Sequence, residues 1–180
     1  MPKVKKSLSE AVSAEIKSKF DLNSFKEKKG LKQNVKFKDQ EWIPLSKAFQ
    51  DVTSVPGIPM GHIVLLRGHS DTGKTTALLE AAVAAQKRQI LPVFIITEMK
   101  WSWDHAKMMG MEVNEVVDKE TGEIVNYDGN FIYVDRESIN SIEDVAVFIL
   151  DLIDEQKRGN LPYDLLFLWD SIGSVPCEMS

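Results

Sequence analysis

The sequence predicts an α/β fold, in which a parallel sheet carries flanking helices and an amphipathic helix precedes the core. Two observations predict the sheet. Four short apolar runs lack the alternation of a half-exposed strand, which is typical of strands covered on both faces. These runs alternate with helix-like segments at a spacing that favours right-handed crossovers between parallel strands. The predicted strands are residues 63–67, 91–97, 131–134 and 165–169, and the predicted helices are residues 73–88, 103–109 and 141–157.

A basic arm precedes this predicted core. Residues 1–40 hold 11 lysines, no arginine and five acidic residues, a formal charge of +6; from chain totals of 22 and 27, this leaves 11 basic and 22 acidic residues, or −11, for residues 41–180. We therefore predict two parts, an arm over residues 1–40 and a core over residues 41–180. Such an arm contacts nucleic acid or an acidic subunit in some proteins and is a solvated tail in others.

Residues 7–20 of the arm are predicted to form an amphipathic helix. Ser7 and Glu10 have capping-box spacing, and apolar side chains recur every four residues, at Leu8, Val12, Ile16 and Phe20. This narrow apolar stripe needs a partner surface, in the same domain or on another protomer. Residues 21–40 are polar and rich in lysine, and we expect a linker there.

Composition excludes several classes of protein. The chain has 180 residues and 43% hydrophobic content, enough to bury a core, and no apolar run approaches the length of a membrane span. The polar start lacks a hydrophobic signal core, which argues against secretion and favours a cytoplasmic location. Cys177 is the single cysteine, so an internal disulfide framework is excluded.

The most informative motif follows the first predicted strand and opens the first core helix. It fits the phosphate-binding P-loop in pattern and in context. Its glycines allow positive φ and close backbone approach, so that successive N–H groups point at phosphate beside the positive end of a helix. The motif therefore predicts that the chain binds a nucleoside triphosphate. Its residues are Gly68, His69, Ser70, Asp71, Thr72, Gly73, Lys74 and Thr75, followed by Thr76.

Within this motif, Lys74 is expected to reach the β- and γ-phosphates, and Thr75 is expected to supply a ligand to Mg²⁺. Two further segments frame the core. Residues 56–61 are predicted to form a rigid turn that leads into the P-loop strand, and residues 113–128 are predicted to form a surface hairpin inserted into the core.

Two strand-end carboxylates complete the predicted site. Asp170 ends an apolar run, the form of a Walker B element whose carboxylate holds Mg²⁺ opposite Thr75; Ser171 follows it and has the chemistry to bond the same hydration shell. Glu98 follows another strand at the edge where ligands collect in parallel sheets, and there it would orient and deprotonate an attacking water. Lys74 lies 96 positions before Asp170 with a complete strand and its acid between them, which argues against nucleotide kinases and simple GTPases.

Together these residues resemble the ATPase core of RecA-type recombinases, including the phage UvsX proteins. The resemblance covers residues 42–176 and rests on the run at residues 58–64, the P-loop with its Thr75-Thr76 pair, Glu98, and Asp170-Ser171. It implies a RecA-like P-loop core that binds ATP and Mg²⁺, forms filaments on single-stranded DNA, and serves homologous recombination and repair in a bacterial or phage-infected cell. It also implies that the N-terminal helix docks onto a neighbouring protomer.

By the same resemblance, Glu98 matches the catalytic glutamate and Lys74 the catalytic lysine, and His105 lies near the aromatic position that packs on adenine. RecA-type cores continue beyond the Walker B strand with two DNA-contacting loops and a γ-phosphate sensor, which these 180 residues lack. We therefore expect the N-terminal portion of a recombinase, with DNA bound through missing C-terminal loops and a second polypeptide able to complete the core. DNA-stimulated ATP hydrolysis is expected only after that completion.

Two alternatives remain open at this stage. The motor of a hexameric replicative helicase has the same core, and Glu98-Met99 after a strand also resembles its corresponding segment. The chain also fits a non-catalytic nucleotide-binding fragment that caps or regulates a filament. Trp101 and Trp103 have the chemistry to stack on a base, although tryptophans near a domain surface more commonly serve packing.

Overall fold

The structure is a computed structural model that describes residues 21–30, 39–98 and 100–178. The predicted helix over residues 7–20 lies outside the described residues. The chain divides into two compact units, Met1–Asp39 and Gln40–Ser180.

The described part of the first unit contains helix α2 (Leu22–Lys28). Part of the segment expected to be a linker, residues 21–40, is therefore helical, and the linker role itself stays a prediction. The Asp21 carboxylate caps the helix by accepting hydrogen bonds from the N–H groups of Asn23 and Ser24, at 2.9 and 3.2 Å. Lys26 and Lys28 lie in its last turn, where positive charge complements the helix dipole. The lysine content that suggested a linker is thus compatible with a short capped helix.

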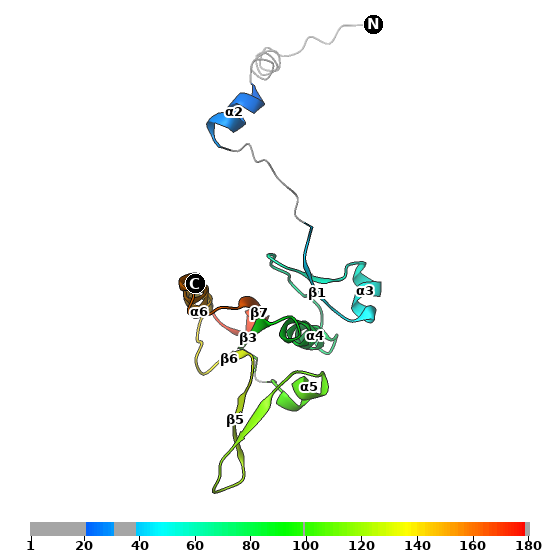
Figure 1. Cartoon of the computed structure of the whole chain (residues 1–180), viewed down its shortest axis with the longest axis vertical. Helices are drawn as coiled ribbons and strands as arrows, with labels where there is room; N and C mark the ends of the chain where they lie inside the picture. Colours follow the sequence, from blue (N-terminus) through cyan, green and yellow to red (C-terminus); the bar gives the residue numbers. More distant parts are fainter. Residues whose placement is uncertain (1–20, 31–38, 99, 179–180) are drawn as a thin grey trace. The chain divides into compact units, whose positions relative to one another are not determined.

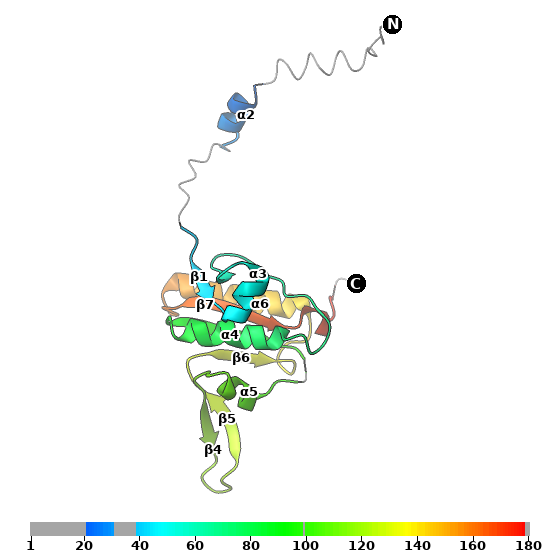
Figure 2. The same ribbon diagram turned by 90° about the vertical axis from the view of Figure 1, so that its right-hand side faces the viewer.

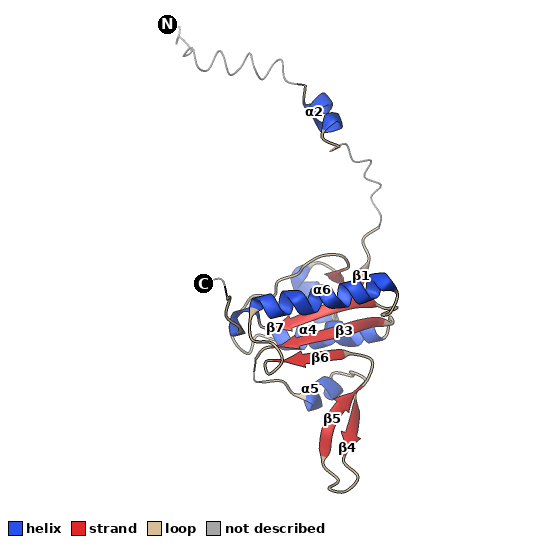
Figure 3. Cartoon of the chain, turned by 90° about the vertical axis from the view of Figure 1, so that its left-hand side faces the viewer, coloured by secondary structure: helices blue, strands red, loops and turns tan. Residues whose placement is uncertain are grey.

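A three-stranded parallel sheet organises the second unit, as the sequence predicts. Its order is β6 (Ile132–Asp135), β3 (Ile90–Ile96), β7 (Asp164–Asp170), and Phe94 of β3 lies opposite both Tyr133 and Leu168. Helices α4 (Lys74–Gln86) and α6 (Ile142–Arg158) cover opposite faces of this sheet (Figures 1, 2 and 3). The predicted strands and helices in these regions are confirmed.

The central strand β3 is buried along its whole length because helices cover both of its faces. On one face Phe94 packs in a cluster with Leu79 of α4, whose small alanines allow close approach to the sheet. On the other face Ile95 packs with Val145 of α6. Helix α6 begins with a capping box formed by Ser141 and Asp144, which explains its sharp start.

A small antiparallel pair, missed from the sequence, lies at the amino end of the sheet. Strand β1 (Trp42–Pro44) pairs with β2 (Gly57–Pro59), and helix α3 (Lys47–Thr53) connects them. β2 occupies part of the predicted turn at residues 56–61. A Cβ on Gly57 would lie 2.0 Å from the carbonyl oxygen of Ile43, so only glycine permits this close pairing.

The predicted hairpin is confirmed as β4 (Asn114–Val117) and β5 (Ile124–Asp128), which project away from the sheet (Figure 2). An ion pair connects the hairpin to helix α5 (Trp103–Met108). The ammonium group of Lys107 on α5 pairs with Glu115 on β4 and also with Asp104 on its own helix. The hydrogen bond to Glu115, followed by that to Asp104, raises the pKa of Lys107.

The strand predicted over residues 63–67 is not formed. In the described part of the chain, no backbone hydrogen bond joins this segment to another residue, and Ile63 and Leu65 are 102% and 71% exposed. An apolar run becomes a strand only when a neighbouring strand supplies hydrogen-bond partners. β7 forms a ladder with β3 and with no other described strand. Among the described residues, residues 63–67 therefore have no neighbouring strand to pair with. A search of the described residues finds no helix long and apolar enough to span a membrane.

Candidate nucleotide-binding site

The loop over residues 68–73 has the backbone conformation that its glycines predict. Gly73 adopts a φ of +84° and Asp71 a φ of +61°, both in the left-handed region. At Gly68, an added Cβ would lie 2.8 Å from the hydroxyl oxygen of Thr72, and that hydroxyl donates a hydrogen bond of 2.8 Å to the carbonyl of His69. The loop is therefore wound tightly on itself, and side chains larger than hydrogen at Gly68 would disturb it.

Helix α4 starts directly after this loop. Gly73 is its N-cap and offers no side-chain cap, so the first N–H groups of the helix and its positive dipole end are directed at the loop. The Lys74 ammonium group bends back over the same loop and donates to the carbonyl oxygens of Gly68 and His69, at 3.1 and 2.7 Å. The loop thus gathers N–H donors and a positive charge in one place, the combination that binds phosphate.

The predicted metal-binding pair meets in the structure. The hydroxyl of Thr75, in the first turn of α4, donates a hydrogen bond of 2.6 Å to the Asp170 carboxylate at the end of β7, and both side chains are half-buried. Hydroxyl and carboxylate oxygens are hard ligands that suit Mg²⁺. Within the described ranges, no group of three or more histidine, cysteine or acidic side chains is placed to hold a metal. The pair therefore fits a cation that takes its other ligands from phosphate and water.

Glu98 lies at the same edge of the sheet, one strand away. Its backbone N–H donates to the carbonyl of Asp170 at 3.2 Å, and its exposed side chain accepts a hydrogen bond of 2.8 Å from the hydroxyl of Ser171. Ser171 also bonds Ser174 at 2.7 Å. Ser171 therefore connects the two predicted carboxylates: its hydroxyl bonds Glu98, and it follows Asp170 directly in the chain.

Thr97 is a structural residue of the site that sequence reasoning missed. It is 1% exposed, receives a hydrogen bond of 3.1 Å from the indole of Trp169, and donates one of 2.8 Å to the carbonyl of Ser171. These bonds fix the ends of β3 and β7 relative to each other. A threonine that ends an apolar strand just before Glu98 was the available signal.

Other predicted contacts are not brought together. His105 lies half-buried on α5, and no hydrogen bond between described residues joins its side chain to the loop at residues 68–75, so its adenine contact stays a prediction. Trp101 and Trp103 are half-buried and pack against other aromatic rings: Trp101 lies 5.0 Å from Phe94, and Trp103 stacks on Tyr127 at 4.9 Å, both measured between ring centroids. These contacts agree with the packing role expected for the two tryptophans rather than with stacking on a base.

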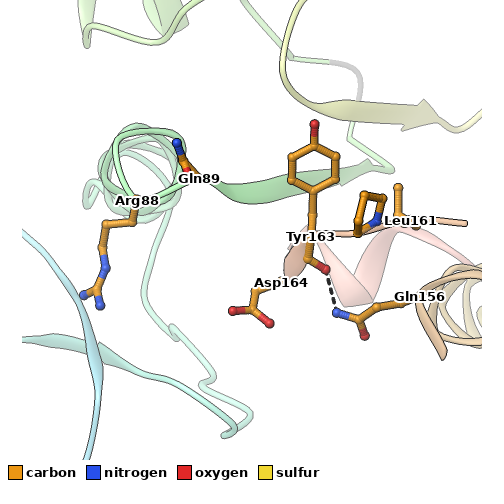
Figure 4. A pocket seen from close by; sticks show the side chains of 7 residues that line it. Arg88, Gln89, Gln156, Leu161, Tyr163 and Asp164 are labelled. Carbon is orange, nitrogen blue, oxygen red and sulfur yellow. Dashed lines mark hydrogen bonds between the residues drawn. The ribbon is translucent and has the colours of Figure 1, made fainter. Parts of the chain in front are cut away.

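A surface hollow lies at the opposite edge of the sheet (Figure 4). Asp164 and Tyr163, at the start of β7, line it together with Arg88, which follows α4. Gln156 of α6 donates a hydrogen bond of 2.6 Å to the carbonyl of Tyr163 and closes one side. Because it lies where the strands begin, this hollow is separate from the candidate site at their carboxyl ends.

The fold and this site define an α/β protein with a parallel sheet, whose candidate ligand site lies at the carboxyl edge of the strands. The family model described as the RecA N-terminal domain matches residues 6–135, and the chain belongs to this family. The resemblance to RecA-type recombinases is thereby confirmed, and the helicase alternative is not favoured.

Several curated relatives named Protein RecA match parts of the chain. The protein from Aquifex pyrophilus is 38% identical over 77 residues, which cover 42% of this chain and 22% of that protein. The protein from Treponema denticola is 31% identical over 117 residues, which cover 63% of this chain and 28% of that protein. The chain thus matches only about a quarter of the length of these relatives. No solved structure matches the chain.

Proposed function

We propose that this chain is the ATP-binding part of a RecA-type DNA recombinase. The observation that carries the proposal is the 2.6 Å hydrogen bond between Thr75 and Asp170. It brings the loop at residues 68–75 to the strand end that carries the expected Mg²⁺ ligand. A glycine-rich loop alone binds phosphate weakly and unspecifically, whereas a loop paired with a strand-end carboxylate binds phosphate and a divalent cation together.

Each residue of the site then has a defined task. The N–H groups of the loop and of the first turn of α4 bind the phosphate oxygens, and Lys74 exchanges its bonds to the loop carbonyls for bonds to phosphate. Thr75 and Asp170 hold the cation, either directly or through its water shell. Mg²⁺, when bound, neutralises charge on the phosphates. Glu98 orients the attacking water and accepts its proton, and Ser171 positions the Glu98 carboxylate through its hydrogen bond.

The wider role follows from family membership and is part of the proposal. A RecA-type recombinase assembles as a filament on single-stranded DNA, with protomers docked through an N-terminal helix, and serves recombination and repair. Contact with DNA is part of this proposal, because the chain matches only about a quarter of the length of the RecA relatives. The basic arm at residues 1–40 supports an interaction with DNA or with the acidic core of a neighbouring protomer.

Binding of a fluorescent ATP analogue tests the first part. We expect Mg²⁺-dependent binding that Lys74→Ala weakens at least tenfold, since it removes a charge-assisted contact of about 1.5–3 kcal/mol. Lys87→Ala is the matched control, because Lys87 is an exposed lysine at the other end of the same helix. Equal loss in both variants would show unspecific attraction to lysines and would contradict the proposal.

ATP hydrolysis with and without single-stranded DNA tests the second part. Hydrolysis by the chain alone that DNA stimulates and that Glu98→Gln abolishes would identify a complete motor and exclude the non-catalytic fragment. Binding without hydrolysis would instead identify a fragment that needs its completing polypeptide. Loss of hydrolysis in Glu98→Gln with unchanged nucleotide affinity is the signature expected of a group that acts on water rather than on phosphate.

A further inference from the structure

The hydroxyl of Ser171 lies between two polar partners. Its oxygen is 2.8 Å from Oε1 of Glu98 and 2.7 Å from the hydroxyl oxygen of Ser174. An ionised carboxylate only accepts hydrogen bonds, and a serine hydroxyl has a single proton to donate. Ser171 therefore donates its proton to Glu98, and Ser174 must be the donor in the bond between the two serines. The three side chains form a directed chain from Ser174 through Ser171 to Glu98.

The backbone around the two serines is held independently of Glu98. The carbonyl of Ser171 accepts a hydrogen bond of 2.8 Å from the buried hydroxyl of Thr97, at the end of β3. The carbonyl of Ser174 accepts one from the guanidinium group of Arg136, which follows β6. The N–H group of Ser174 also donates to the carbonyl of Ser171, at 3.1 Å. Contacts from two other strand ends thus fix the turn in which the two hydroxyls meet.

The side chain of Glu98 has much less support of its own. It is exposed and follows the last residues of β3, and a glutamate in that setting samples several staggered rotamers unless a bond selects one. Among the residues that the structure describes, Ser171 is the one hydrogen-bond donor to this carboxylate, and it reaches Oε1. Hydrogen bonds in a chain polarise one another, so donation from Ser174 strengthens the bond from Ser171 to Glu98.

We propose that Ser174 is a positioning residue, which sets the orientation of the Glu98 carboxylate through the hydroxyl of Ser171. The inference rests on the proposed function, in which Glu98 acts on the attacking water, and it deepens that function. With Oε1 held by Ser171, Oε2 is the oxygen that accepts a proton from the water. The water oxygen forms its bond to the γ-phosphorus as that proton leaves, and the bond from the γ-phosphorus to the leaving oxygen breaks. Ser174 contacts neither the water nor the phosphate.

A double-mutant cycle in urea unfolding tests whether Ser174 and Glu98 are coupled. Ser174→Ala and Glu98→Ala are made singly and together, and the loss of the folding equilibrium constant is compared. If the chain exists, the double variant should lose roughly threefold less than the product of the two single losses, because the second change has no intact chain left to break. The same cycle in a Ser171→Ala background should be additive, since the linking hydroxyl is gone.

Nuclear magnetic resonance reports the orientation itself. Scalar couplings across the Cα–Cβ bond of Glu98 should indicate one dominant rotamer in the wild-type chain and a mixture in Ser174→Ala, whereas Ser174→Thr, which keeps a hydroxyl, should retain the wild-type couplings. Ser138→Ala is the matched control. The Ser138 hydroxyl bonds the Asp135 carboxylate at 3.5 Å, at the end of the neighbouring strand β6, so this variant should change neither the Glu98 couplings nor the additivity with Glu98→Ala.

Any of three results would overturn the inference: additive losses for Ser174→Ala and Glu98→Ala, a coupling that survives in the Ser171→Ala background, or Glu98 couplings that Ser174→Ala leaves unchanged. Both measurements are made without nucleotide. A chain that shows the coupling but binds no nucleotide would therefore reject the proposed function and keep the positioning of Glu98. Nucleotide binding without the coupling would reject the role of Ser174 alone.

Discussion

The hydrogen bond between Thr75 and Asp170 is the contact on which the candidate site depends, and Thr75→Val removes it with little change of shape. The variant leaves the half-buried Asp170 carboxylate without its 2.6 Å donor. A hydrogen bond to a charged group contributes about 1.5–3 kcal/mol. Because both side chains are only half-buried, water replaces part of the loss, and we expect the lower end of that range.

Urea unfolding followed by tryptophan fluorescence measures this loss, since Trp169 is adjacent to Asp170. With a slope of about 2 kcal/mol per molar urea, a loss of about 1.5 kcal/mol lowers the unfolding midpoint by roughly 0.8 M. Thr75→Ser keeps the hydroxyl and should retain most of the stability and the Mg²⁺-dependent part of nucleotide affinity. The reasoning is refuted if Thr75→Val unfolds at the wild-type midpoint, or if Thr75→Ser loses as much as Thr75→Val.

Three further perturbations test other parts of the structure. Gly57→Ala should lower stability by about 3 kcal/mol, because its Cβ would meet the Ile43 carbonyl at 2.0 Å, whereas Gly173→Ala, with nothing within 4 Å, should be neutral in the same thermal melt. Phe94→Ala should cost about 3–5 kcal/mol in chemical denaturation, since this fully buried ring fills the central strand. Hydrogen bonds from the backbone of Thr121 and then Glu120 hold the pKa of Asp118 below the usual range of an aspartate. The hairpin turn should therefore keep this stabilisation above the usual pKa of an aspartate and lose it as the pH falls through the depressed pKa. An NMR titration should show this transition in the wild-type chain and not in Asp118→Asn.

The sequence predicted the elements whose signal is local. The apolar run that forms β3 and the long amphipathic pattern of α6 are each read from neighbouring residues. The pair β1–β2 was missed because three-residue strands show no period, and its closest contact depends on Gly57 meeting Ile43, a distant residue. At residues 63–67 the sequence instead predicted a strand that the structure does not form. Its side chains have strand character, but a strand also needs a neighbour, and no local pattern reports whether that neighbour is present.

The candidate site, like the fold, has parts that the sequence predicted and parts that it did not. Asp170 and Glu98 were predictable because each carboxylate ends an apolar strand, and strand ends meet at one edge of a parallel sheet. The link between them was not predictable, since it depends on the register that places Ile96 opposite Asp170. That register brings Ser171 within 2.8 Å of Glu98 and lets Thr97 bond both Trp169 and Ser171. Residues that join strand ends are determined by tertiary pairing and become visible only in the structure.

These observations together indicate how the phosphate loop is held. On the helix side, Thr75 ties the loop to Asp170, and α4 is packed on the sheet. On the strand side, residues 63–67 have no backbone partner among the described residues, so the loop is anchored from one side only. A loop that adopts its binding conformation for a fraction of the time has its affinity reduced by that fraction. The hydrogen bond between Thr75 and Asp170 raises that fraction from the helix side, so we expect Thr75→Val to lower nucleotide affinity and Thr75→Ser to retain most of it.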